Sequence, residues 1–163
     1  MPACLTGVRS ASVASHVITL LFLMLRLPSE IHLQMIGHCL RGLPDEACGL
    51  LAGHADSEQV IRCYPTRNMA ASAKLYTVDP LAHLRADREA EAGGSEIIGV
   101  FHSHTHTDAY PSPTDIAQAP DPRWHYVIVS LRDTHPVVRS YAIVDGQVVE
   151  ESVIVHRHFA QAS

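Results

Sequence analysis

The pattern of hydrophobic and polar positions along the chain predicts short strands interrupted by two longer helices. Apolar residues at helical spacing predict a first helix over residues 30–40, with Ser29 as its N-cap. The apolar positions on its buried face are Ile31, Met35, Ile36, Cys39 and Leu40. A second helix is predicted from Asp79 to about residue 91, and a short third helix from Ser112 to the proline at position 120.

Runs rich in apolar and β-branched residues predict the strands. These runs cover residues 25–28, 47–53, 60–65, 75–78, 96–101, 125–131, 137–144 and 147–155. Asp145 and Gly146, between the last two runs, are the two-residue signal of a tight hairpin. The order of the elements predicts the α/β class, with a curved sheet that is mixed or mainly antiparallel, flanked by two longer helices and one short helix.

The segment before residue 24 fits this pattern poorly. Its apolar run over residues 17–24 resembles the core of a signal peptide, but only Arg9 precedes the run and no small-residue cleavage site follows it. The run is also too short to span a bilayer. We therefore expect residues 1–23 to be a disordered or spurious N-terminal extension, and residues 24–163 to form a single domain.

Composition narrows the classes of function. Hydrophobic residues make up 47% of the 163 residues and charged residues 18%, as in ordinary globular proteins. The net charge of −5 argues against a nucleic-acid partner, which would need a basic face. The four cysteines show neither metal-binding nor disulfide spacing, so we expect buried thiols in a reducing, cytoplasmic compartment, with no membrane contact.

Candidate chemistry is concentrated between residues 99 and 115. His102 and His104 stand two residues apart at the end of a predicted strand, so their imidazoles face the same side. A proline-containing bend and the short third helix can then return Asp115 towards them. Two imidazoles and one carboxylate are the three protein ligands of an open, catalytic zinc site, whose fourth position is left to water.

Ordinary structural roles would also account for these residues. A His-x-His pair is more often two surface or core histidines than a pair of metal ligands. Ser112 and Asp115 have the spacing of a capping box, in which each side chain binds a backbone N–H of the other. Capping and metal binding are compatible, because the helix dipole keeps the carboxylate ionised. Glu46, at a loop-to-strand junction, would by itself be a solvated acid.

Together these positions resemble the signature of the JAMM (MPN-plus) zinc metallopeptidases. That signature is an upstream Glu46, then His102-x-His104, seven residues, and Ser112-x-x-Asp115. The resemblance covers almost the whole chain after about residue 24. Within the family, the histidine run and the Ala-Tyr-Pro-Ser that follows it are most similar to actinobacterial hydrolases acting on a sulfur-carrier protein that bears a C-terminal cysteine.

The resemblance implies a fold, a metal and a mechanism. The implied fold is the MPN fold, which is cytidine-deaminase-like. The implied cofactor is Zn²⁺, and its ligands would be His102, His104 and Asp115. Glu46 would act as general acid and base, and Ser112 would donate a hydrogen bond to the oxyanion.

Two neighbouring residues fall outside this set. His106 lies one strand step beyond the second histidine, but the family uses two histidines, so we do not expect His106 to bind the metal. Many relatives have proline where this chain has Thr105, so the loop beyond His104 can differ from theirs.

The resemblance also implies a substrate, the amide between the C-terminal glycine of a ubiquitin-like sulfur-carrier protein and cysteine, presented as a Gly-Gly-cysteine adduct. Its hydrolysis would release cysteine in a thiocarboxylate-dependent route of cysteine biosynthesis. The alternatives are a JAMM isopeptidase acting on another ubiquitin-like modifier, and a non-catalytic MPN scaffold. A zinc deaminase is excluded, because its His-x-Glu and Pro-Cys-x-x-Cys motifs do not occur in the sequence.

Overall fold

The computed structural model of the chain describes residues 24–157. The expected N-terminal extension, residues 1–23, lies outside the described residues. In chain order the elements are β1 Met24–Pro28, α2 Ser29–Gly42, β2 Cys48–His54, β3 Gln59–Thr66, α3 Pro80–Ala92, β4 Glu96–His104, α4 Pro113–Ala117, β5 His125–Ser130, β6 Val137–Val144 and β7 Gln147–His156. The predicted α/β class is confirmed.

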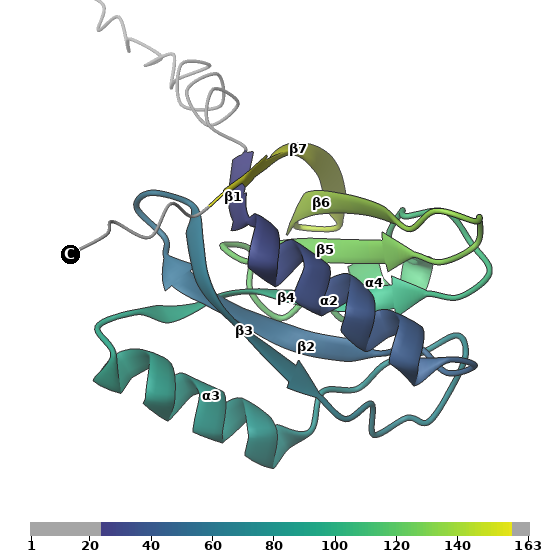
Figure 1. Cartoon of the computed structure of the whole chain (residues 1–163), viewed down its shortest axis with the longest axis horizontal. Helices are drawn as coiled ribbons and strands as arrows, with labels where there is room; N and C mark the ends of the chain where they lie inside the picture. The colour runs from purple at the N-terminus through teal and green to yellow at the C-terminus, as the bar shows by residue number, and fades with distance from the viewer. Residues whose placement is uncertain (1–23, 158–163) are drawn as a thin grey trace, which may run out of the picture.

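The strands close into a barrel in the order β1-β3-β2-β4-β5-β6-β7 (Figure 1). β1 runs parallel to β3 and β7, β4 runs parallel to β5, and the other pairs are antiparallel, so the sheet is mixed as predicted. Closure was not predicted. It depends on β1 lying between β3 and β7, and the pairing of β1 with β3 consists of the single pair Arg26↔Gln59.

Two hydrophobic clusters lie on opposite faces of the central strands. One contains the buried face of α2 together with Leu51, Phe101, Val127 and Val129. The other contains Ala86 and Ala90 of α3 together with Leu50, Val100, Tyr126 and Ile128. Neighbouring residues of β2, β4 and β5 therefore alternate between the clusters, because successive side chains of a strand point to opposite faces. Burial on both faces explains why the central residues of these strands are mostly apolar.

The structure corrects three local predictions. β1 passes directly into α2, so the helix begins at Ser29 and Ser29 is not its N-cap. The N-cap position is taken by Pro28, which has no side-chain oxygen to accept a hydrogen bond. Leu40, predicted on the buried face, is 48% exposed. The predicted strand over residues 75–78 is reduced to one bridge, Asn68↔Val78. Its backbone groups bond instead to the Asn68 side chain, which accepts from Thr77 N and donates to Leu75 O.

Other local predictions are confirmed. Asp79 caps α3 through its side chain, and Asp145 and Gly146 form the hairpin turn with φ values of 50° and 75°. The thiols of Cys39, Cys48 and Cys63 are free and buried.

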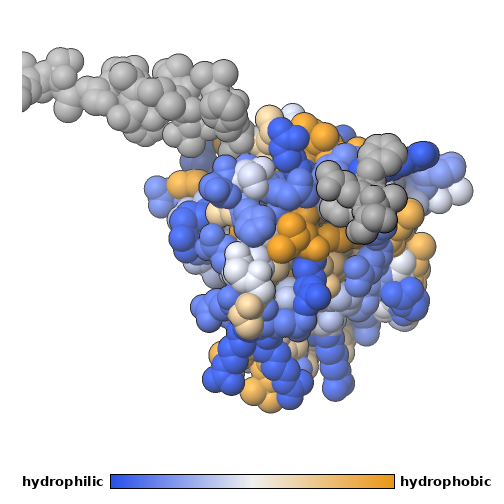
Figure 2. Space-filling model, turned by 60° about the vertical axis from the view of Figure 1, so that its left-hand side comes forward, coloured by the Kyte–Doolittle hydropathy of each residue, from blue (hydrophilic) through white to orange (hydrophobic). Residues whose placement is uncertain are grey.

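One face of the molecule is mostly polar. Figure 2 shows a face dominated by hydrophilic side chains, with smaller apolar areas between them. Among residues 24–157, no helix is both long enough and apolar enough to cross a membrane.

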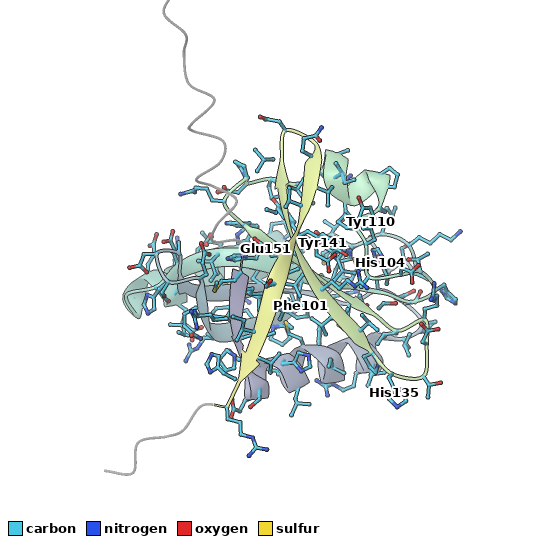
Figure 3. All side chains as sticks on the ribbon, turned by 90° about the horizontal axis from the view of Figure 1, so that it is seen from above. Phe101, His104, Tyr110, His135, Tyr141 and Glu151 are labelled. Atoms are coloured by element: carbon cyan, nitrogen blue, oxygen red, sulfur yellow. The ribbon has the colours of Figure 1, made fainter. Side chains whose placement is uncertain are left out.

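A buried ionic cluster links β5 and β7. His125 Nδ1 lies 2.8 Å from Glu151 Oε2, and its Nε2 lies 2.7 Å from Glu58 Oε2. Ser140 Oγ donates a further hydrogen bond to Glu151 at 2.6 Å. Burial alone would lower the pKa of His125, but hydrogen bonding to Glu151 and the charges of both glutamates outweigh burial and raise it. Figure 3 shows Glu151 well separated from His104, so this cluster is distinct from the histidine pair at the end of β4.

We predict a pH-dependent contribution of His125 to stability. Because its folded-state pKa lies above the ordinary 6.5, the contribution is fully present below about pH 6.5 and is lost as pH rises through the raised pKa. Replacing His125 by Gln leaves Glu151 buried without its cation, a loss on the order of 3–5 kcal/mol at low pH. Urea unfolding of both proteins between about pH 6 and 9 measures the difference. A difference that grows with pH would contradict the assignment.

Candidate metal centre

Strand β4 carries two histidines to the end of a buried face. β4 lies between β2 and β5, where His102 pairs with Cys48 on one side and Ile128 on the other. His102 and His104 share the face of Val100, whereas the residue between them points to the opposite face. The two histidines are 2% and 4% exposed. The fold thus places two imidazoles side by side in a buried position.

The connection after β4 is held against the barrel by two hydroxyl groups. Ser130 Oγ donates to the carbonyl oxygen of Thr107 at 2.6 Å, and the hydroxyl of Tyr141 donates to the carbonyl oxygen of Ala109. These contacts tie the loop to β5 and β6. The chain is thereby turned back, so that α4 begins beside the end of β4.

The start of α4 fixes the carboxylate of Asp115. Ser112 Oγ accepts a hydrogen bond from Asp115 N at 3.2 Å, and Asp115 Oδ2 accepts one from Ser112 N at 2.7 Å. Together with Pro113 at the first helical position, this is the complete capping box that the sequence predicted. The bond from Ser112 N to the carboxylate, and the bond that fixes the Asp115 backbone, leave the side chain little freedom to turn away from β4.

Three side-chain atoms converge at this point. The Nε2 atoms of His102 and His104 are 3.1 Å apart, and Asp115 Oδ2 lies 3.5 Å from the first and 3.4 Å from the second. A tetrahedral zinc ion with bonds of about 2.0–2.1 Å holds neighbouring ligand atoms roughly 3.3 Å apart. The observed separations fit that geometry, so these three residues could hold a divalent metal ion.

Hydrogen bonding selects the tautomer of one imidazole. His104 Nδ1 lies 2.8 Å from the carbonyl oxygen of Asp108, which can only accept, so Nδ1 carries the proton. Nε2 then presents a lone pair to the centre, as a metal ligand requires. His102 is held differently. Its buried Nδ1 has no hydrogen-bond partner within residues 24–157, and the ring stacks on Tyr76 with centroids 4.2 Å apart.

The charge states of Asp115 and His102 also suit a cation. Burial alone would raise the pKa of Asp115, but the polar contacts with the neighbouring His102 and His104 rings hold it well below its usual range. Burial lowers the pKa of His102, which favours the neutral ring. Burial would do the same to His104, but its bonds to Asp115 and the Asp108 carbonyl raise the pKa instead. An ionised carboxylate beside a neutral imidazole is the state in which metal ions bind.

Glu46 lies in the loop before β2 and is 6% exposed. Burial raises the pKa of Glu46 to about 7, while His104 lowers it and the charge of Asp115 raises it further. A carboxyl group with a pKa near 7 can both accept and deliver a proton at neutral pH. A divalent cation bound nearby would favour the ionised form.

The backbone around Glu46 is fixed at both of its polar groups. Glu46 N donates to the carbonyl oxygen of Ser72 at 2.9 Å, and the Glu46 carbonyl accepts from Asn68 Nδ2 at 2.9 Å. The next residue, Ala47, binds Ser103 twice, through its N–H to Ser103 Oγ at 2.8 Å and its carbonyl to Ser103 N at 2.9 Å. Ser103, the residue between the two histidines, therefore joins the Glu46 loop to β4.

A small cavity lies in front of these groups. It has a volume of about 280 Å³ and is lined by Glu46, Ala73, Lys74, His104, Thr105, His106, Thr107 and Ser112. Glu46 and Ser112, the two residues expected to act in catalysis, thus face one space beside the converging ligand atoms. His106 lines the cavity too, but it lies outside the cluster formed by His102, His104 and Asp115.

Several residues of this centre were not singled out from the sequence. Contacts between distant segments of the chain bring these residues to the centre. They are Asn68, Lys74, Tyr76 and Ser103. The one available signal was a stretch of mostly small and polar residues, 67–74, between two predicted strands.

The family model described as prokaryotic homologs of the JAB domain matches residues 28–144. The chain belongs to this family. The JAB fold and the arrangement of the His102, His104 and Asp115 side chains therefore occur together in this protein.

Individual relatives are similar over most of their length. The chain is 45% identical over 122 residues to the CysO-cysteine peptidase of Mycobacterium tuberculosis, covering 74% of this chain and 84% of that protein. It is 36% identical over 130 residues to a probable TtuB-protein conjugate cleaving protease of Thermus thermophilus, covering 78% and 81%. Among solved structures, a protein of Desulfitobacterium hafniense is 36% identical with a TM-score of 0.77, covering 84% and 96%. The named relatives are hydrolases, which supports hydrolase activity in this chain.

We predict that His104→Ala abolishes tight metal binding, because it removes one of three ligand atoms. His106→Ala is the matched control and should keep one metal ion per chain after dialysis. Elemental analysis measures metal content, and thermal unfolding with and without a chelator measures the linked stability. A metal ion at a thousand times its Kd adds about 4 kcal/mol to the free energy of unfolding. Chelation should therefore lower the Tm of the wild type and of His106→Ala, and leave the Tm of His104→Ala unchanged. Full metal content in His104→Ala would overturn the ligand set.

Proposed function

We propose that this protein is a zinc-dependent hydrolase that cleaves the amide between the C-terminal glycine of a ubiquitin-like sulfur-carrier protein and cysteine. The observation that carries the proposal is the convergence of His102, His104 and Asp115 beside a cavity that Glu46 also lines. The 45% identity to a CysO-cysteine peptidase supports this choice of substrate.

In this proposal His102 and His104 hold the ion through Nε2, and Asp115 holds it through Oδ2. Bound zinc supplies a Lewis acid that makes water a nucleophile near neutral pH. The chain's own contribution is to orient the ligands and to keep the space small. The proposed extent of the domain remains residues 24–163, of which the family match covers 28–144.

Glu46 is the proposed general acid and base. Its carboxylate accepts the proton of the attacking water and returns it to the nitrogen of the leaving cysteine. The pKa of about 7 supports this role, as do the two bonds that fix its backbone, one donated to the Ser72 carbonyl and one accepted from Asn68. The C–O bond would form first and place negative charge on the former carbonyl oxygen; the C–N bond would then break as its nitrogen takes the proton from Glu46, giving a carrier carboxylate and a free amino acid.

Ser112 is the proposed oxyanion donor. Its hydrogen bond from Asp115 N uses an oxygen lone pair and not the hydroxyl hydrogen, so the hydroxyl can cap α4 and still donate into the cavity. The two roles considered from the sequence are therefore compatible in one side chain.

The cellular role follows from the proposed reaction. Release of cysteine from the carrier would complete a thiocarboxylate-dependent route of cysteine biosynthesis, in the cytoplasm where the carrier is made. The alternative substrate is another ubiquitin-like modifier joined to a protein, which the 36% identity to a TtuB-protein conjugate cleaving protease favours.

The direct test incubates the zinc-loaded protein with a ubiquitin-like carrier that bears a C-terminal cysteine, and follows the carrier by mass spectrometry. We expect the mass of one cysteine residue to be lost, and a chelator to stop the loss. Cleavage of an isopeptide-linked conjugate alone would move the proposal to the alternative substrate.

Glu46→Gln should retain zinc and lose turnover. The amide keeps the shape of the side chain but cannot accept a proton, and general acid–base groups contribute typically 10²–10⁴-fold in rate. Glu91→Gln, which neutralises an exposed carboxylate on α3, is the control and should be fully active. Metal content and kcat are measured on the same samples. Full activity in Glu46→Gln would exclude it as the acid and base.

Ser112→Ala separates catalysis from capping. Loss of an oxyanion donor lowers kcat by on the order of 10²–10³-fold, whereas loss of an N-cap costs roughly 1 kcal/mol of stability. Asp79→Ala, which removes the cap of α3 away from the cavity, should lose similar stability and no activity. If Ser112→Ala behaved like Asp79→Ala, the hydroxyl would be a cap only.

A further inference from the structure

The chain has a single lysine, Lys74, and this lysine lines the cavity together with Glu46. The protein carries a net charge of −5, so the positive charge of Lys74 at the cavity is opposite in sign to the charge of the protein as a whole. Within residues 24–157, no carboxylate lies within ion-pair distance of the Lys74 ammonium. The side chain is exposed, so its charge is free to meet a ligand that enters the cavity.

The backbone beside Lys74 is tied to the site. Lys74 N donates to Ser72 Oγ at 3.1 Å, and the carbonyl of Ser72 accepts from the N–H of Glu46. The carbonyl of Ala73 accepts a hydrogen bond from Thr105 Oγ1 at 3.1 Å. The loop that carries the lysine is therefore fixed between the Glu46 loop and the end of β4.

We propose that Lys74 binds the free α-carboxylate of the leaving amino acid, an inference that rests on the proposed function. The α-carboxylate is attached to the carbon next to the scissile nitrogen, so it lies within a few ångströms of the bond that breaks. At this distance it would be repelled by an ionised Glu46 and attracted by Lys74. The cavity, of about 280 Å³, is at the low end of the size of small-molecule sites, as a single amino acid requires.

This contact distinguishes two classes of substrate. In an isopeptide, the leaving nitrogen is the end of a lysine side chain, and the carbon next to it bears no carboxylate. Lys74 would then meet no partner charge. The residue is therefore a determinant of specificity for single amino acids attached to a carrier, and it selects against modifier conjugates.

The test compares two carrier adducts that differ at one group, one ending in cysteine and one ending in cysteine amide. The full-length, zinc-loaded wild type should prefer the free acid by roughly 10- to 100-fold in kcat/KM, the usual worth of a hydrogen bond to a charged group. Lys74→Gln should lose this preference through slower cleavage of the acid alone. Lys74→Arg should keep most of it. Arg67→Gln removes an exposed cation of the same loop that does not line the cavity, and should behave as wild type.

The outcomes separate the two proposals. Cleavage of both adducts at equal rates by the wild type would leave the proposed function standing and overturn the role of Lys74. An equal fall in kcat/KM for both adducts in Lys74→Gln would also overturn the role of Lys74, because a purely structural role would slow both reactions. Cleavage of neither adduct would overturn the proposed function and the inference together.

A second measurement does not depend on turnover. Because the sequence contains one lysine, an amine-acylating reagent modifies only Lys74 and the chain N-terminus, and peptide mass spectrometry resolves the two. N-acetylserine should slow acylation of Lys74 in the zinc-loaded protein, and N-acetylserine amide should not. Equal rates with both compounds would contradict carboxylate binding at this lysine.

Discussion

The Oδ2 atom of Asp115 joins the start of α4 to the end of β4, and the centre depends on this atom. It accepts the N–H of Ser112 and lies within 3.5 Å of both histidine Nε2 atoms. Helix capping and the geometry of the cluster are thus one interaction. A change that frays the first turn of α4 also moves Asp115 Oδ2, so local helix stability and the three-atom cluster cannot vary independently.

Burial shifts the pKa values of neighbouring acids and bases in opposite directions, and nearby polar groups decide which charge state each residue adopts. It raises the pKa of Glu46 and lowers that of His102, in each case towards the neutral form. For Asp115 the contacts with the two imidazoles outweigh the effect of burial on its pKa, and the carboxylate stays ionised. One buried environment therefore contains a carboxyl group poised to exchange protons beside another that stays charged.

Local patterns predicted much of this arrangement. Alternation along β4 was enough to place His102 and His104 on one face, and the spacing of Ser112 and Asp115 was enough for the capping box. The closure of the barrel was not predictable in this way, because it depends on β1 lying between strands far away in the sequence. The support of Glu46 by Asn68 and Ser103 is of the same kind, a contact between distant segments. The predicted roles of the site residues stay predictions.

β4 is bonded to β2 on one side and to β5 on the other along the stretch that leads to His104. A polypeptide therefore cannot reach the cluster by adding itself as a strand to β4, because the backbone groups that would pair with it are already used. In the proposed function, a carrier tail would instead enter end-on, from the cavity. Each residue of an extended tail advances about 3.3 Å, so the length of the unstructured end would set how far a folded partner reaches. A compact protein without such an end would then be a poor substrate.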